Sequence, residues 1–299
     1  MNGRNEAPFV GCCMAELLDR GVKFPMIVLY PTTTPAETAM IGPYPLNVAL
    51  DAAPDVSADR RRPLVLLSHG SGGSPILYRT LAFRLARGGF VVGMPEHPGN
   101  NQRDNTLHGT IENLIARPRH ISAALNWFSE SEWFRSTLRS GRVPIIGHSM
   151  GGYTALAVAG GIPTALPHEA PSGFAHIITG TRDSRVGSLV LLAPATIWYR
   201  SEGALSEIEA PILMLFGNRD DLTPPGIHAK IVLNGVRNRE KVRCHIVENA
   251  GHFSFLSPFP PYMSNNTFLP SQDPPGFDRR SFLDKLHVEI LNFLTQKGT

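Results

Sequence analysis

The chain has 299 residues, of which 42% are hydrophobic and 18% charged, and its formal net charge is +3. This length suffices for one large α/β domain or two small ones, and the composition is that of an ordinary globular protein. So slight a charge gives no reason to expect nucleic acid or an anionic membrane as a partner. No apolar run approaches the ~18 residues that a membrane span needs.

The start of the chain and its cysteines indicate a compartment. Residues 1–8 lack the apolar core of a secretory signal, so we expect none. Three cysteines, Cys12, Cys13 and Cys244, cannot form a disulfide framework, and adjacent Cys12 and Cys13 would point to opposite faces of a strand. Small buried thiols are therefore expected, and the cytoplasm is the predicted location.

In chain order, the apolar patterns predict an antiparallel start and then a regular alternation of strands and helices. Residues 9–14 and 24–30 are β-like, whereas residues 31–62 are rich in Pro, Ala, Thr and Asp and predict an irregular extension. Short apolar runs, typical of strands buried on both faces, follow at 64–67, 90–94, 143–146, 189–192 and 212–216, and residues 242–247 are predicted as a last strand. Helical patterns lie at 75–87, 119–128, 154–159 and 282–294.

This alternation predicts an α/β protein with a mostly parallel central sheet and helices on both faces. There is no internal repeat and no linker after residue 60, so we expect a single domain over residues 1–299. Its first part, residues 1–62, would hold the N-terminal strands and the irregular extension. Residues 160–187 are rich in Gly and Pro and long enough to overhang a site, which makes them a possible lid-like insertion.

The sequence Gly147-His148-Ser149-Met150-Gly151 carries the strongest chemical signal. A G-x-S-x-G pattern between an apolar run and a helix is the strand–turn–helix context of a nucleophilic serine. The serine would sit in a strained turn, and side chains at positions 147 and 151 would collide with neighbouring backbone. We therefore predict Ser149 as a nucleophile, the alternative being a plain glycine-rich corner.

A serine nucleophile needs a base, and the base needs an acid that fixes its tautomer. In open parallel sheets such residues gather beyond the carboxyl ends of strands. Asp220 and Asp221 both follow the strand 212–216, and this position alone leaves either as the acid. Asp183 precedes a strand instead, so a structural salt bridge suits it better.

The candidate base is His252, which follows the last strand, 242–247. The small residues Ala250 and Gly251 would let its loop cross over the sheet. Of the eleven histidines, His252 alone comes after both serine and acid in a loop at a strand end. The order Ser149, aspartate, His252 matches that expected for a strand–serine–helix motif on an α/β sheet.

Two backbone donors are predicted for the oxyanion. The Met150 N–H follows the nucleophile directly, and the glycine-rich loop 69–73 would supply the Ser71 N–H. His69, His97 and His148 could approach His252 near the strand ends, but no pair has the spacing of a metal site and no C-x-x-C occurs. We therefore expect no metal.

Apolar residues follow two of the strand ends where a substrate would lie. Phe253 comes directly after the candidate base, and Trp198 and Tyr199 follow the strand 189–192. Their loop positions predict an apolar pocket wall, which favours hydrophobic esters over sugars or phosphates.

These motifs resemble those of the α/β-hydrolase superfamily. More narrowly, the chain is similar to the bacterial predicted dienelactone hydrolases, which are related to the platelet-activating-factor acetylhydrolases. The resemblance covers most of the chain and rests on residues 63–70, 96–100, 147–153, 182–186, 250–255 and 275–280. It implies an α/β-hydrolase fold and hydrolysis of a carboxylic ester through an acyl-enzyme, without a cofactor. The family's acid-loop spacing falls on Gly217, Asp220 and Pro224, which favours Asp220 over Asp221.

The chain departs from these families in two places. Dienelactone hydrolases use a cysteine nucleophile where this chain has Ser149, which argues against dienelactone as the substrate. The platelet-activating-factor enzymes carry their acid after the strand that follows the nucleophile strand, and residues 193–196 here hold no carboxylate. Phospholipid specificity is therefore not carried over.

The sequence thus predicts a serine esterase that acts on a small-molecule ester with an apolar acyl or alcohol part. An amidase, peptidase or thioesterase would use the same three residues and is the main alternative. A non-catalytic ligand-binding protein on this fold is a third hypothesis, although such proteins usually lose one of the three. The oligomeric state is not indicated by any motif.

Overall fold

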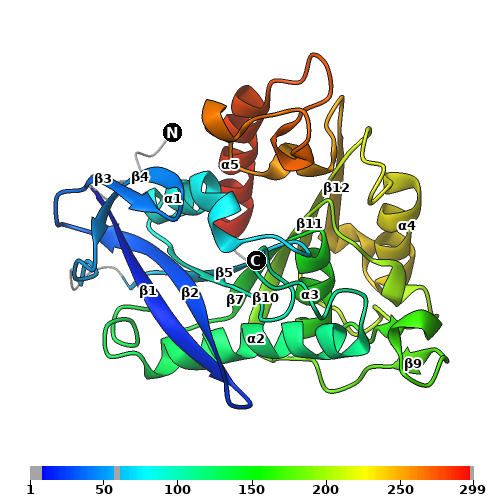
Figure 1. The fold of residues 1–299 in the computed structure, drawn as a ribbon. Helices are drawn as coiled ribbons and strands as arrows, with labels where there is room; N and C mark the ends of the chain where they lie inside the picture. The colour runs from blue at the N-terminus through cyan, green and yellow to red at the C-terminus, as the bar shows by residue number, and fades with distance from the viewer. Residues whose placement is uncertain (1–8, 57–60, 297–299) are drawn as a thin grey trace.

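The computed structural model describes residues 9–56 and 61–296. Residues 1–8, on which the expectation about a secretory signal rests, lie outside the described residues. A ten-stranded sheet crosses the molecule in the order β12-β11-β10-β7-β5-β6-β2-β1-β4-β3 (Figure 1). Its strands are β1 (Phe9–Asp19), β2 (Val22–Thr32), β3 (Glu37–Ile41), β4 (Tyr44–Leu50), β5 (Leu64–Ser68), β6 (Val91–Pro95), β7 (Val143–His148), β10 (Val186–Leu192), β11 (Ile212–Gly217) and β12 (Val242–Val247).

The six strands from β6 to β12 in this sheet are parallel to one another, and β1 and β2 add an antiparallel start. The predicted mostly parallel sheet is therefore confirmed. All residues of β5, β10 and β11 are buried, which explains why these strands are continuous apolar runs. The β12 strand is an edge strand and is only partly buried.

The prediction of an irregular extension over residues 31–62 was wrong for part of that stretch. Strands β3 and β4 form an antiparallel hairpin there, and β4 also pairs with β1 in parallel. The two strands meet at Gly42, whose φ of 57° is in the left-handed region that favours glycine. The hairpin was missed because much of it is exposed and it holds no long apolar run.

Helices cover both faces of the sheet, as predicted. They are α1 (Arg79–Arg87), α2 (Ile111–Glu130), α3 (Met150–Val158), α4 (Pro225–Gly235) and α5 (Arg279–Thr295). Buried side chains of α1 and α5 belong to one hydrophobic core cluster, whereas those of α2, α3 and α4 belong to another across the sheet (Figure 1). None of these helices, within the part of the chain that the structure describes, is both long and apolar enough to cross a membrane.

The helix predicted at residues 119–128 is longer than expected, because α2 begins at Ile111 and continues through Pro118. Proline has no N–H to donate to the carbonyl four residues before it, which here is that of Leu114. The hydroxyl of Tyr153, on α3, donates to that carbonyl at 3.0 Å instead. A neighbouring helix thus supplies the missing donor and lets α2 pass through the proline.

Candidate active site

The strand ends at one edge of the sheet bring together the loops that hold the predicted site residues. Ser149 follows β7, Asp220 follows β11, and His252 follows β12. The loop 69–73 follows β5, the neighbour of β7. Because all four strands are parallel, their carboxyl ends lie at the same edge.

Ser149 occupies a strained turn between β7 and α3. Its φ of 54° and ψ of −118° lie outside the regions that residues with a side chain normally adopt. A Cβ at position 147 would lie 2.1 Å from the carbonyl oxygen of Gly151, and one at position 151 would lie 1.9 Å from that of Ser68. The two glycines of the motif are therefore required by close backbone approach, as the sequence indicated.

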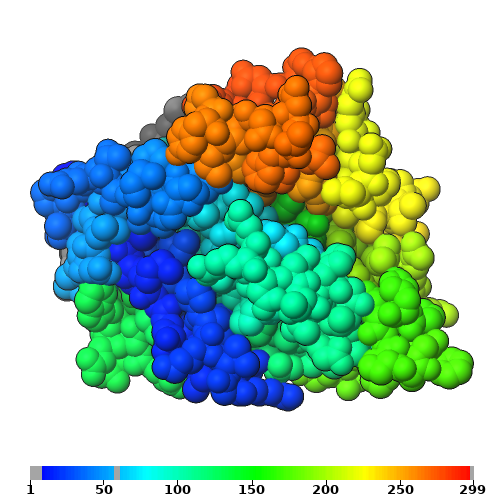
Figure 2. All heavy atoms as spheres, in the orientation of Figure 1, coloured from blue at the N-terminus to red at the C-terminus, as the bar shows by residue number. Residues whose placement is uncertain are grey.

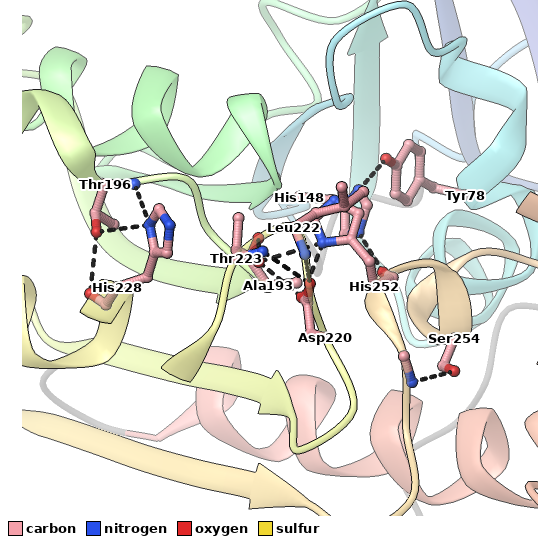
Figure 3. A network of polar contacts seen from close by, with 11 residues as sticks. Tyr78, His148, Ala193, Thr196, Asp220, Leu222, Thr223, His228, His252 and Ser254 are labelled. Carbon is pink, nitrogen blue, oxygen red and sulfur yellow. Dashed lines mark hydrogen bonds and ion pairs between the residues drawn. The ribbon is translucent and has the colours of Figure 1, made fainter. Parts of the chain in front are cut away.

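Asp220 is 3% exposed and accepts four hydrogen bonds. The backbone N–H groups of Leu222 and Thr223 donate to Oδ1 at 2.9 and 2.8 Å. The hydroxyl of Thr223 donates to Oδ2 at 2.7 Å, and His252 Nδ1 lies 2.8 Å from the same oxygen (Figure 3). Asp221, the other candidate acid, is exposed. The structure therefore pairs Asp220, and not Asp221, with His252.

The Asp220 carboxylate is held in its charged form. Burial by itself would raise the pKa of this carboxyl, but the hydrogen bonds from His252 and Thr223 outweigh it and lower the pKa to about 2. An ionised carboxylate requires a proton on His252 Nδ1. In this tautomer of the neutral imidazole, Nε2 is a hydrogen-bond acceptor, as a general base requires.

His148, the residue before the serine, supports the loop of His252 from the other side. Its Nε2 lies 3.0 Å from the backbone carbonyl of His252 and must donate, so Nδ1 accepts from the hydroxyl of Tyr78 at 2.9 Å (Figure 3). The Tyr78 hydroxyl in turn accepts from the Gly70 N–H at 3.3 Å. Burial lowers the pKa of His148 to about 3, which keeps this histidine neutral.

A pocket of about 250 Å³ opens at this edge, and Ser149 and His252 both line it. Four aromatic residues contribute to its wall, namely Tyr44, Tyr78, Phe253 and Phe268. Further apolar side chains are those of Leu77, Leu222, Leu256 and Pro270. Among the described residues that line the pocket there is no carboxylate, ammonium or guanidinium group. In Figure 2 the surface is hollowed between the orange residues, which follow His252, and the cyan to blue-green loops.

Ser149 and His252 are related by the pocket that both of them line. The hydrogen bonds of the described residues do not include one between the Ser149 hydroxyl and His252, although both side chains face the same pocket. Bonds of this kind are often long before substrate binds and tighten in the reacting complex.

The two predicted oxyanion donors also lie at this pocket. Ser71 is exposed at its rim, and Met150 is the first residue of α3. Within the described part of the chain, neither the Ser71 N–H nor the Met150 N–H donates a hydrogen bond. Both donors are therefore available to a bound oxyanion.

Trp198 and Tyr199 are not brought to the pocket, which corrects their predicted place in its wall. Tyr199 is 2% exposed, and its hydroxyl donates to the carbonyl of Tyr153 at 2.8 Å. The indole N–H of Trp198 donates to Glu169, and its ring packs on Tyr153. Both side chains pack against Tyr153 on α3, because the short helix that carries them, Ile197–Tyr199, turns into the core.

Residues 160–187 include two short strands, β8 (Thr164–Ala165) and β9 (His176–Ile177), and the start of β10, and none of these residues lines the pocket. The segment that does reach over it comes after His252, through Phe268 and Pro270. In that segment the hydroxyl of Tyr262 donates to the carbonyl of Pro43 at 2.8 Å, which ties it to the β3–β4 hairpin. The position of this segment was not indicated by the sequence pattern.

The other histidines near the strand ends hydrogen-bond one another and the backbone. His69 Nε2 accepts from the His97 N–H at 3.1 Å, and His97 Nδ1 lies 3.2 Å from His120 Nδ1. In the described part of the chain, no group of three or more His, Cys, Asp or Glu side chains could hold a metal ion. Asp183, as expected, pairs with Arg185 at 2.6 Å.

Comparison with known proteins gives three related findings. A family model described as the alpha/beta hydrolase fold matches residues 63–198. One curated relative is a bis(hydroxyethyl) terephthalate hydrolase of Streptomyces coelicolor, which is 27% identical over 62% of this chain and 46% of the relative. Another is esterase YjfP of Escherichia coli, which is 25% identical over 58% of this chain and 75% of the relative. The chain thus spans about half the length of the first relative. A solved structure of a predicted CIB-like hydrolase from Thermoplasma acidophilum covers 95% of this chain and 99% of its own, with a TM-score of 0.54 and 15% identity.

At 15% identity the solved structure bears on the fold alone. Together with the family match and the sheet order, it shows that the chain has the α/β-hydrolase fold. The chain is thus similar to proteins of the α/β-hydrolase superfamily over residues 63–198, and the two curated relatives are named as a hydrolase and an esterase.

Proposed function

We propose that this protein is a serine esterase that hydrolyses a small, uncharged carboxylic ester. The observation that carries the proposal is the 2.8 Å contact between Asp220 and His252 beside a pocket that Ser149 also lines. The names of the two relatives support the same reaction class. The motifs shared with predicted dienelactone hydrolases agree with it, while Ser149 in place of cysteine favours an ordinary ester.

In the proposed reaction, Ser149 Oγ attacks the ester carbonyl and His252 Nε2 takes its proton. The N–H groups of Met150 and Ser71 bind the oxyanion, and Asp220 stabilises the imidazolium that forms. His252 then protonates the leaving alcohol, which departs and leaves an acyl-enzyme. A water molecule, deprotonated by His252, hydrolyses the acyl-enzyme and restores the serine.

The pocket lining supports an uncharged substrate with an aromatic or other apolar group. Its four aromatic rings favour such a group, and a carboxylate would lose its hydration there without meeting a cationic partner. Bis(hydroxyethyl) terephthalate, from which one relative takes its name, is an uncharged aromatic ester. We therefore place uncharged esters of aromatic carboxylic acids first among the candidate substrates.

Replacing the nucleophile tests the reaction. We expect Ser149→Ala to lower kcat on 4-nitrophenyl acetate by at least about a thousandfold, and to lose covalent labelling by a fluorophosphonate. Wild-type activity in this variant would overturn the proposal. A parallel panel of matched esters, thioesters and anilides tells an esterase from a thioesterase or an amidase.

A second measurement tests the substrate class. We expect kcat/KM for bis(hydroxyethyl) terephthalate to exceed that for its half-ester, which has one free carboxylate, by about tenfold or more. Equal values for the diester and the half-ester would contradict an uncharged substrate while leaving the serine mechanism intact.

A further inference from the structure

A buried arginine lies behind the loop and the helix that hold the proposed oxyanion donors. Arg117, in the middle of α2, is 0% exposed. Its guanidinium donates to the carbonyl oxygen of His69, to Asn100 Oδ1 at 2.6 Å and to Thr154 Oγ1 at 2.9 Å. It also lies 3.3 Å from Ser68 Oγ. All of these acceptors are neutral.

The charge of Arg117 has no ion-pair partner in the part of the chain that the structure describes. Within the described residues, no carboxylate forms an ion pair with its guanidinium. Burial opposes the charged form and lowers the pKa of Arg117 to about 9, which still leaves the side chain charged at pH 7. An unpaired buried charge is costly, and an apolar side chain of similar size would be cheaper if only packing mattered.

The residues that accept hydrogen bonds from Arg117 are close in the chain to, or in contact with, the residues of both proposed oxyanion donors, Ser71 and Met150. On one side, His69 lies two residues before Ser71, and the amide of Asn100 donates to Ser71 Oγ at 2.8 Å. On the other side, the hydroxyl of Thr154 donates to the carbonyl of Met150 at 3.0 Å. The guanidinium of Arg117 thus contacts both the loop 69–73 and helix α3. The relative position of this loop and this helix sets the distance between the Ser71 and Met150 N–H groups.

We propose that Arg117 is a positioning residue that braces the two halves of the oxyanion site and adds a fixed positive charge behind them. This inference rests on the proposed function, because it concerns the oxyanion that forms in ester hydrolysis. A rigid brace keeps both donors aimed at one point, so no reorganisation is needed when the negative charge appears. In a dry interior, the charge of the guanidinium favours an oxyanion more than a neutral substrate.

The test compares Arg117→Met and Arg117→Lys with Arg119→Met. Arg119 lies two residues further along the same helix and pairs with Asp19 in a partly buried ion pair, so its replacement removes a guanidinium that does not contact the loop 69–73. Active sites are counted by end-point fluorophosphonate labelling, and kcat is expressed per labelled site. The affinity for an aryl boronic acid, which binds serine as a tetrahedral anion, is measured in parallel.

We expect Arg117→Met to lower kcat per labelled site by about tenfold to a hundredfold and to weaken boronate binding by a similar factor, with KM changed less than about threefold. Arg117→Lys keeps a charge but cannot contact all the acceptors, so its values should be intermediate. Arg119→Met should stay within about twofold of wild type. If Arg117→Met does not fold, Arg117→Lys decides the question.

Two results would overturn the inference. One is a kcat per labelled site in both Arg117 variants that equals that of Arg119→Met, which would make Arg117 a packing residue. The other is a lower kcat with unchanged boronate affinity, since the brace acts on the tetrahedral anion. Failure of the proposed function is distinct, because wild-type protein itself would then neither hydrolyse the ester nor label at Ser149.

Discussion

Thr223 binds the carboxylate of Asp220 twice, through its backbone N–H to Oδ1 at 2.8 Å and through its hydroxyl to Oδ2 at 2.7 Å. The same hydroxyl lies 3.2 Å from His252 Nδ1 and 3.1 Å from the carbonyl oxygen of Ala193 (Figure 3). Thr223 therefore fixes the plane of the Asp220 carboxylate, and its contact with Ala193 ties it to the end of the neighbouring strand β10. The orientation of His252 depends on that plane.

Thr223→Val should weaken this control while preserving the side-chain shape. Hydrogen bonds to charged groups contribute about 1.5–3 kcal/mol, and only part of this acts on the orientation of His252. We expect kcat for 4-nitrophenyl acetate to fall about threefold to tenfold, with KM nearly unchanged. Thr223→Ser should restore most of the rate because it keeps the hydroxyl. A Thr223→Val variant with wild-type kcat would show that the backbone N–H groups alone suffice.

The adjacent aspartates offer a matched pair for testing the acid. Asp220→Asn should lower kcat by about a thousandfold to ten-thousandfold, because an amide at this place favours the wrong tautomer of His252. Asp221→Asn changes an exposed side chain next door and should stay within about twofold of wild type. Kinetics on one neutral ester at pH 7.5 compares both variants. The opposite ranking would move the acid to Asp221.

Local motifs indicated several residues of the candidate site. The sequence around Ser149 carries its own evidence, because close backbone contacts at Gly147 and Gly151 permit only glycine there. His252 could be predicted from its place after the last parallel strand. The choice between Asp220 and Asp221 is different, since both follow the same strand and only burial and the contact with His252 separate them.

The contacts that the sequence did not reveal join residues far apart in the chain. Tyr78 meets His148 across 70 positions, and Arg117 meets His69 across 48. No local pattern encodes such a pair. The prediction for Trp198 and Tyr199 was wrong because a loop position at a strand end does not determine the direction in which a side chain points.

The buried neutral histidines predict a loss of stability in acid. Burial lowers the pKa of His69, His120 and His148 to about 3, against an ordinary value of 6.5. Above pH 6.5 both the folded and the unfolded chain hold these rings neutral, so they contribute no pH dependence. As the pH falls from about 6.5 towards 3, the unfolded chain binds protons that the folded chain does not, and stability decreases.

Each such histidine can lower the free energy of unfolding by up to about 1.4 kcal/mol per pH unit within that window. His120→Gln keeps a polar partner for His97 but cannot titrate. We expect urea unfolding at pH 7, 6, 5 and 4 to give a shallower fall for this variant than for wild type. His176→Gln, at an exposed position, should follow the wild-type curve. Parallel curves for His120→Gln and wild type would contradict the prediction.

Tyr78 connects the loop 69–73 to His148, the residue before Ser149. Its hydroxyl accepts from the Gly70 N–H and donates to His148 Nδ1, and His148 Nε2 donates to the carbonyl of His252. Tyr78→Phe would leave a buried ring nitrogen of His148 without a donor, which costs about 1–3 kcal/mol. The same loss would let His148 rotate or change tautomer, so the His252 loop would lose a fixed contact.

We therefore expect Tyr78→Phe to lower both the melting temperature and kcat per labelled site, the latter by about threefold to tenfold. Tyr44→Phe is the matched control, because the Tyr44 hydroxyl belongs to the same pocket but makes no hydrogen bond among the described contacts. His148→Phe should produce a similar loss of rate, and adding Tyr78→Phe to it should cost little more, since both changes break one chain of contacts. Additive losses in the double variant would mean that the two residues act independently.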